Sequence, residues 1–195
     1  KSRLLPTQRI QISFFILLLG FTSCGPGVVR PPLEILERDL PYSALRADDP
    51  AWHRSEMEIP NFGYVSRTIW LRFPVENTQS TQANFILEVG APWMDRIEFY
   101  MKKDDSVIYG ASGLRVDESR AFFHRHPAFG YSLSGKEKNF IYLRAQTEGL
   151  LSLPVRVWGA QDFANKIQME YAIHALYFGT IASLFLYNLA LFFFV

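Results

Sequence analysis

Arginine and aromatic side chains alternate in three short segments of this sequence. In each segment the two residues are two positions apart, which places them on the same face of a β-strand. The pairs are Trp70 and Arg72, Tyr142 and Arg144, and Arg156 and Trp158. Aromatic rings pack against the apolar face of a sugar, and arginine donates hydrogen bonds to ligand oxygens. If the strands are neighbours, we expect a groove for a sugar or carboxylate. The alternative is a solvated face whose arginines pair with Glu88 and Glu98.

Other residues that could bind a metal or act in catalysis give weaker signals. His124 and His126 share a strand face, and His53 lies far upstream, but no cysteine or acidic cluster completes a set of four ligands. Asp104 and Asp105 follow two lysines at what we predict to be a hairpin turn. The sequence contains no GxSxG, P-loop or HExxH motif. We therefore expect no metal, no cofactor and no enzymatic activity within these residues.

The middle of the chain has the alternating apolar pattern of half-buried strands. In the segment 68–75, Ile69, Leu71 and Phe73 face one side, whereas Trp70 faces the other. The same period of two recurs in the segments 84–90, 95–101, 106–110, 139–146 and 153–159. Short strands separated by turns, with no helical crossovers, predict a mainly β domain over residues 33–160, folded as an antiparallel jelly-roll β-sandwich.

Residues 1–24 have the layout of a secretory signal peptide. Basic residues precede the short apolar run 12–21, which is too short for a comfortable membrane span, and small residues follow it. Cys24, the only cysteine, ends the stretch "LLGFTSC", which is similar to a bacterial lipobox. We expect either lipidation at Cys24 or an ordinary cleavage site beside it. The Pro- and Gly-rich residues 25–32 then form a linker.

The C-terminal residues 171–195 form the predicted transmembrane helix. They contain no Asp, Glu, Lys or Arg, and roughly 25 helical residues exceed a hydrocarbon core of about 30 Å. The joint 161–170 lacks Gly and Pro, so we expect it to connect the β domain stiffly to this helix. Asn188 lies deep in the apolar run, where an amide usually contacts another helix. We expect that contact to shift on signalling or to hold helices together, in a protein that continues beyond Val195.

Four segments, in order, resemble one family of bacterial receptors. They are "NFGYVSRTIWLRFPVEN", "APWMDRIEFY", "FIYLRAQTEGLLSLPVRVW" and "GTIASLFLYNLALFF". Together they resemble the seven-transmembrane receptors with diverse intracellular signalling modules, the 7TM-DISM family. The first three are similar to its extracellular domain of the second type. The fourth is similar to the start of its membrane domain, and the similarity includes Tyr187 and Asn188 as helix-contact residues.

This resemblance implies a ligand-sensing receptor in the bacterial inner (cytoplasmic) membrane. The jelly roll would be similar to carbohydrate-binding modules, would bind a glycan or small molecule, and would lie in the periplasm with residues 25–170. The partners of the helix would be the membrane and six further helices, and an output enzyme such as a histidine kinase or diguanylate cyclase would follow Val195. A formal charge of +1 argues against a nucleic-acid partner. The alternative is an envelope structural or accessory (lipo)protein, anchored by Cys24 and one helix, that senses nothing.

Overall fold

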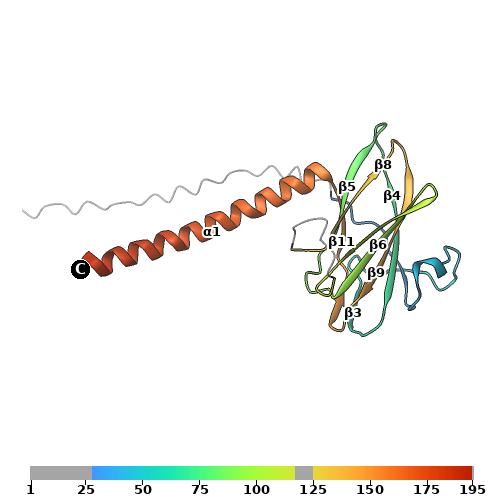
Figure 1. Ribbon diagram of the computed structural model, residues 1–195, viewed down its shortest axis with the longest axis horizontal. Helices are drawn as coiled ribbons and strands as arrows, with labels where there is room; N and C mark the ends of the chain where they lie inside the picture. The colour runs from blue at the N-terminus through green and yellow to red at the C-terminus, as the bar shows by residue number, and fades with distance from the viewer. Residues whose placement is uncertain (1–27, 117–124, 195) are drawn as a thin grey trace, which may run out of the picture.

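The computed structural model describes residues 28–116 and 125–194 of the chain. The predicted signal peptide, the candidate lipidation site Cys24 and His124 lie outside the described residues. Figure 1 shows the two parts of the structure: a β domain and a single long helix that projects away from it. The β domain holds all the strands, and the helix follows the last of them.

In the described part of the chain, antiparallel strands form one large sheet, one small sheet and a short ribbon. The large sheet contains, in spatial order, β2 (His53–Arg54), β1 (Glu34–Leu36), β4 (Ile69–Glu76), β9 (Lys138–Gln146), β6 (Arg96–Lys103) and β7 (Ser106–Ser112). The small sheet contains β11 (Val155–Gly159), β5 (Ala83–Val89) and β8 (Ala128–Leu133). The ribbon pairs β10 (Leu150–Ser152) with β3 (Asn61–Tyr64). A short 3-10 helix, η1 (Tyr42–Ala44), lies between β1 and β2.

The large and small sheets pack face to face around one hydrophobic core. Leu71 and Phe73 of β4 and Leu87 of β5 belong to this core and have no exposed surface. Phe99 of β6 stacks on Phe129 of β8 with ring centroids 5.4 Å apart, so this contact joins the two sheets. The prediction of a mainly antiparallel, sandwich-like β fold is confirmed, and the finer jelly-roll topology stays a prediction.

The strands that the prediction missed include β2, β3, β8 and β10. The segment of β8, "AFGYSL", contains Gly130 and Ser132, which are weak strand formers. Its pairing with β5 and the burial of Phe129 and Tyr131 at 4% and 6% exposure decide its structure instead. Tertiary packing therefore overrides local preference in this strand.

The helix α1 (Ala160–Phe194) begins directly where β11 ends, at Gly159. Its 35 residues span about 52 Å at about 1.5 Å per residue. By length and composition the segment Ala160–Phe193 is a candidate membrane span. Its charged residues, Asp162, Lys166 and Glu170, all lie in the first eleven positions. The first turns are therefore polar enough to contact the β domain in water, and the remainder is apolar.

Candidate ligand-binding and signal-transmitting sites

Four of the six predicted ligand-binding residues lie together on the outer face of the large sheet. β4 and β9 are neighbouring strands, and Trp70 lies opposite Arg144 while Arg72 lies opposite Tyr142. Side chains directly opposite each other on one face are close enough to interact. The strand periodicity and the pairing of β4 with β9 thus bring two of the three predicted pairs into one cluster.

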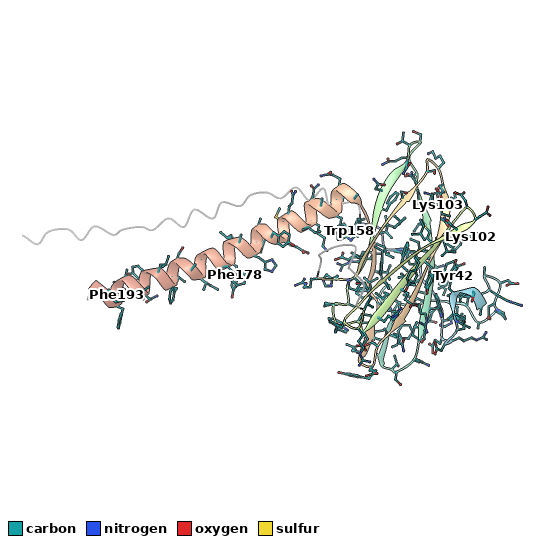
Figure 2. The ribbon with its side chains drawn as sticks, in the orientation of Figure 1. Tyr42, Lys102, Lys103, Trp158, Phe178 and Phe193 are labelled. Atoms are coloured by element: carbon teal, nitrogen blue, oxygen red, sulfur yellow. The ribbon has the colours of Figure 1, made fainter. Side chains whose placement is uncertain are left out.

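The chain's own segment 39–52 covers this face. Tyr42 of η1 stacks on Tyr100 of β6 with ring centroids 4.5 Å apart and an angle of 2° between the planes. The indole N–H of Trp70 donates to the carbonyl of Leu40 at 3.2 Å, and Trp70 has no exposed surface. Figure 2 shows Tyr42 lying against the β domain. In this conformation, therefore, the Trp70 ring contacts protein on all sides.

The arginines of this face are bonded to other residues of the chain. Arg72 pairs with Glu34 of β1, and its guanidinium carbon lies 4.4 Å from the centre of the Trp52 ring. Arg144 pairs with Asp39 at 2.8 Å and with Glu98 at 3.2 Å. The pairing of Arg144 with Glu98 is the arrangement expected for the alternative to a ligand groove.

Glu98 and Asp39 remain ionised well into the acid range. Burial alone would raise the pKa of Glu98, but hydrogen bonds from Arg96, Tyr100 and Arg144 outweigh it and lower that pKa. The pKa of Asp39 is also lowered, mainly by the hydrogen bond from Arg144. Since both carboxylates are charged near neutral pH, Arg144 lies between two opposite charges.

The third predicted pair, Arg156 and Trp158, lies elsewhere, on β11 of the small sheet. Trp158 is 5% exposed, and its ring centroid lies 6.3 Å from that of Phe163 in α1. Arg156 is half-buried and lies opposite Glu88 of β5. The six predicted residues are therefore divided between two sheets, and Trp158 packs beneath the start of the helix.

A buried ion pair fixes the first turns of α1 to the small sheet. The side chain of Glu88 is 1% exposed, and its carboxylate accepts hydrogen bonds from the Trp158 indole at 2.9 Å and from Lys166 at 2.5 Å. The Lys166 ammonium also lies 3.5 Å from Glu170, and the side chain is 14% exposed. Breaking a buried pair on one side leaves an uncompensated charge. This contact therefore resists separation of the helix from β5.

Apolar packing surrounds that ion pair. Phe163 and Ile167, one turn apart in α1, pack with Ile86, Ala128 and Trp158 in a small cluster on the outer face of the small sheet. Sequence reasoning predicted a stiff joint over 161–170 but not these contacts. The residue that could have indicated these contacts is Lys166, which is the only Lys or Arg in residues 160–194.

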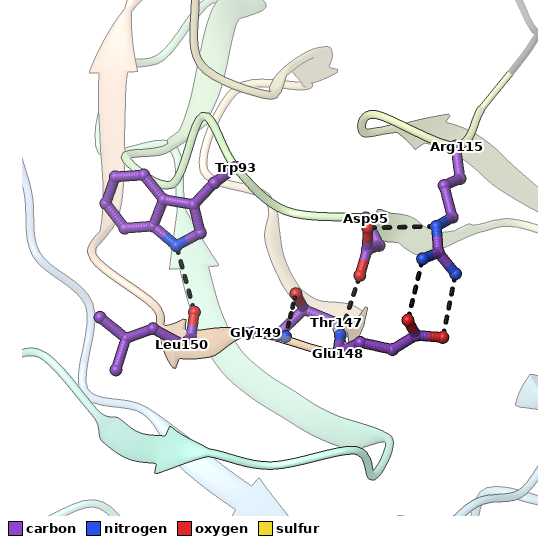
Figure 3. Close-up of a pocket in the computed structure, with 7 residues that line it drawn as sticks. All are labelled: Trp93, Asp95, Arg115, Thr147, Glu148, Gly149 and Leu150. Carbon is purple, nitrogen blue, oxygen red and sulfur yellow. Dashed lines mark hydrogen bonds and ion pairs between the residues drawn. The ribbon is translucent and has the colours of Figure 1, made fainter.

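A separate hollow of about 510 Å³ opens at one end of the β domain, where loops meet. Its lining, drawn in Figure 3, comprises Trp93, Asp95, Arg115, Thr147, Glu148, Gly149 and Leu150. The indole N–H of Trp93 donates to the carbonyl of Leu150 at 3.1 Å, and 47% of the residue is exposed. The ring is thus held in place by its edge while much of its surface stays open.

Arg115 joins two carboxylates at the other side of this hollow. Its terminal nitrogens donate to Glu148 at 3.0 and 2.9 Å, and its Nε lies 3.3 Å from Asp95. The backbone N–H of Glu148 donates to Asp95 at 2.8 Å, which is the main cause of the lowered pKa of Asp95. Hydrogen bonds with Arg115 lower the pKa of Glu148, and the same bonds raise the pKa of Arg115. All three groups are charged near neutral pH.

Gly113 allows the loop that carries Arg115 to approach Asp95. Its φ is +142°, and a Cβ at this position would lie 2.3 Å from the Asp95 carbonyl oxygen. That approach lets the backbone N–H of Arg115 donate to the same carbonyl at 2.9 Å, while the N–H of Leu114 donates to Met94. None of the hollow's residues was predicted from the sequence, because they come from loops far apart along the chain.

Two of the three histidines considered as metal ligands, His53 and His126, lie in the described part of the chain. No group of three or more His, Cys, Asp or Glu side chains there is arranged to hold a metal ion. The turn predicted at Asp104 and Asp105 does connect β6 to β7, and Asp104 has a φ of +52°. Aspartate tolerates this left-handed conformation better than most residues do.

Together, a sandwich-like β domain and a directly attached candidate membrane span are the arrangement expected of a membrane-anchored domain. The family described as 7TMR-DISM extracellular 2 matches residues 36–159, which run from the end of β1 to the end of β11. The chain belongs to this family of extracellular receptor domains, as predicted. Membership implies a sensory or signalling role for the domain and places it outside the membrane. No curated protein matches the chain.

Proposed function

We propose that the chain is the ligand-sensing part of a bacterial receptor of the inner membrane. In this proposal residues 25–170 face the periplasm, and α1 is the first of seven membrane helices, followed by a cytoplasmic effector. The β domain binds a carbohydrate or another small molecule and catalyses no reaction itself. The family match and the candidate membrane span support this assignment.

The observation that carries the proposal is the joint between Glu88 and Lys166. Glu88 lies on β5, the central strand of the small sheet, and Lys166 lies on α1. Because this pair and the cluster around Phe163 bind the helix to the sheet, a ligand that moves β5 also moves α1. A domain that only anchors a protein to the envelope has no need for a rigid joint. Packed interfaces of this kind convert small shifts into discrete rearrangements.

We propose the outer face of β4 and β9 as one surface that binds the ligand. Trp70 and Tyr142 become available to a ligand there only when the segment 39–52 moves away, since Tyr42 and Trp52 now contact that face. Such a displacement would couple ligand binding to a change in β-domain structure. The jelly-roll fold and the similarity to carbohydrate-binding modules remain expectations that support a sugar ligand.

The gene sequence downstream of Val195 tests the receptor assignment directly. We expect six more apolar spans and an effector domain in the same reading frame. A stop codon directly after Val195 would instead favour the anchored envelope protein. A second test measures the contact between the helix and the small sheet by amide hydrogen exchange in lipid nanodiscs. The Lys166→Met change should speed exchange of the amides of residues 160–170, while the amides of the β core stay protected.

A further inference from the structure

We propose that the hollow between Trp93 and the Arg115–Glu148 pair binds a neutral sugar unit of a glycan. This inference rests on the proposed sensory function, and it adds a site and a charge preference for the ligand. It differs from the predicted groove on β4 and β9, because the hollow is open in this conformation and shares no residue with that face.

Trp93 supplies an apolar platform for a sugar ring. The ring cannot turn freely, because its N–H donates a hydrogen bond to the Leu150 carbonyl. The residue is nevertheless 47% exposed, so a ligand can reach it. An ordered aromatic face costs little additional entropy when a ligand packs on it. Figure 3 shows the indole at one side of the hollow and the guanidinium of Arg115 at the other. A ligand that contacts both must be apolar on one face and polar at its edge.

The polar side of the hollow offers hydrogen-bond donors and acceptors next to each other. A guanidinium has five N–H groups, and the two hydrogen bonds of Arg115 to Glu148 and its ion pair with Asp95 leave others directed elsewhere. The carboxylates of Glu148 and Asp95 retain further acceptor positions. Adjacent donors and acceptors match neighbouring hydroxyl groups, each of which both donates and accepts.

The charges of the hollow favour a neutral ligand over an acidic one. Two carboxylates, Asp95 and Glu148, face one guanidinium, so the polar side carries an excess of negative charge. The pKa directions given above keep all three groups ionised near neutral pH. The carboxylate of a uronic acid would be repelled by this negative charge, whereas a neutral sugar carries no charge to be repelled. The volume of about 510 Å³ lies within the range of small-molecule sites.

The test is titration of the full chain with defined sugars, followed by ligand-observed NMR. The chain is placed in lipid nanodiscs, since maltoside detergents would present sugar head groups to the site. The neutral probes are maltotriose, cellotriose, laminaritriose and triacetylchitotriose; trigalacturonic acid is the acidic probe and choline the cationic one. We expect at least one neutral probe to bind. We also expect Trp93→Ala, with its fold checked by circular dichroism, to weaken that binding by about tenfold or more.

Trp52→Ala is the matched control, because Trp52 is an aromatic residue on the other candidate surface, beside Arg72. If the hollow is the site, Trp93→Ala should weaken binding of the neutral probe more than Trp52→Ala does. Stronger binding of trigalacturonic acid or choline, or no binding of any neutral probe, would overturn the inference. So would neutral-sugar binding that Trp52→Ala abolishes and Trp93→Ala does not. That last result would leave the sensory function intact, and the sequence beyond Val195 tests that function independently.

Discussion

Replacement of Lys166 by methionine tests how strongly the helix is held to the β domain. The change removes the ammonium group and keeps most of the apolar stem, so the carboxylate of Glu88 stays buried at 1% exposure and loses its pairing with Lys166. Losing one partner of a buried pair costs about 3–5 kcal/mol of unfolding free energy. We expect the lower end, about 3 kcal/mol, because the Trp158 indole still donates to Glu88.

The assay is thermal unfolding of the chain in lipid nanodiscs, followed by near-ultraviolet circular dichroism. This signal reports the packing of Trp158 and the other aromatic residues, whereas the far-ultraviolet signal would be dominated by a lipid-embedded α1. For a domain of this size, a loss of about 3 kcal/mol lowers the melting temperature by roughly 10–15 °C. The matched control is Lys138→Met, which breaks the exposed pair with Glu76 and should cost less than about 1 kcal/mol.

A double-mutant cycle distinguishes the ion pair from general packing. Glu88→Gln alone should cost about 1–2 kcal/mol, because Lys166 can still reach Glu170 and water. The double variant, Glu88→Gln with Lys166→Met, should be more stable than Lys166→Met alone, since it removes the buried carboxylate together with the ammonium that paired with it. Additive single costs, or a loss below about 1 kcal/mol for Lys166→Met, would refute the view that this pair locks the joint.

Three further predictions concern the loops and the outer face. Gly113→Ala should lose roughly 2–4 kcal/mol in urea unfolding, because of its φ of +142° and the 2.3 Å approach to the Asp95 carbonyl, whereas Gly149→Ala, whose Cβ meets nothing closer than 3.6 Å, should change little. Tyr42→Ala removes the ring stacked on Tyr100 and should speed hydrogen exchange in residues 39–52, while Tyr42→Phe should not. The pKa of Glu98 is lower in the folded chain than its ordinary value of 4.5, so the ionised carboxylate stabilises the fold above pH 4.5, and this stabilisation is lost as the pH falls through the pKa of the folded state. Glu98→Gln should therefore flatten the acid side of a plot of unfolding free energy against pH. Equal slopes for the variant and the parent chain would contradict that assignment.

The apolar alternation of the sequence was sufficient to predict most long strands, because each buries one face. Ile69, Leu71 and Phe73 are fully buried, as their spacing indicated. The same spacing assigned Trp70 to a ligand face, yet this residue is also fully buried. A period of two tells which side chains share a face, but it does not tell what covers that face. Tyr42 and Trp52 could have indicated that the segment 39–52 covers this face, because they are two aromatic residues in a stretch predicted to be irregular.

Strand order and the loop hollow could not be derived from local patterns. β11 pairs with β5 rather than with β4 or β9, which separates Trp158 from the other predicted site residues. Pairings between distant segments depend on the whole fold rather than on propensity. The hollow likewise joins Trp93, Arg115 and Glu148, which are far apart in sequence. Residues 161–170 form the first turns of α1, and the absence of Gly and Pro that favours a helix there is a purely local property of the sequence.

The side chains of α1 indicate how a movement at the joint would travel. Asn188, predicted with Tyr187 to contact other helices, donates its amide to the Leu184 carbonyl at 2.8 Å, and Thr180 and Ser183 bond to carbonyls one turn earlier in the same way. Such bonds reduce the cost of polar groups in lipid, so Asn188 by itself does not require a partner helix. The remaining oxygen and N–H of its amide are the groups that a neighbouring helix would contact.

The helix itself is suited to carry a displacement as a rigid body. Residues 160–194 contain no proline and a single glycine, Gly179, and sharp kinks in helices arise mainly at such residues. The first turns are bonded to the small sheet, whereas Phe178 and Phe193 project outward from the apolar part (Figure 2). A rotation or shift of β5 at Glu88 would therefore reach the far end of α1 with little loss, unless the helix bends at Gly179. In this geometry the direction of movement is set at the joint, and the contacts of the apolar residues decide which neighbouring helices respond.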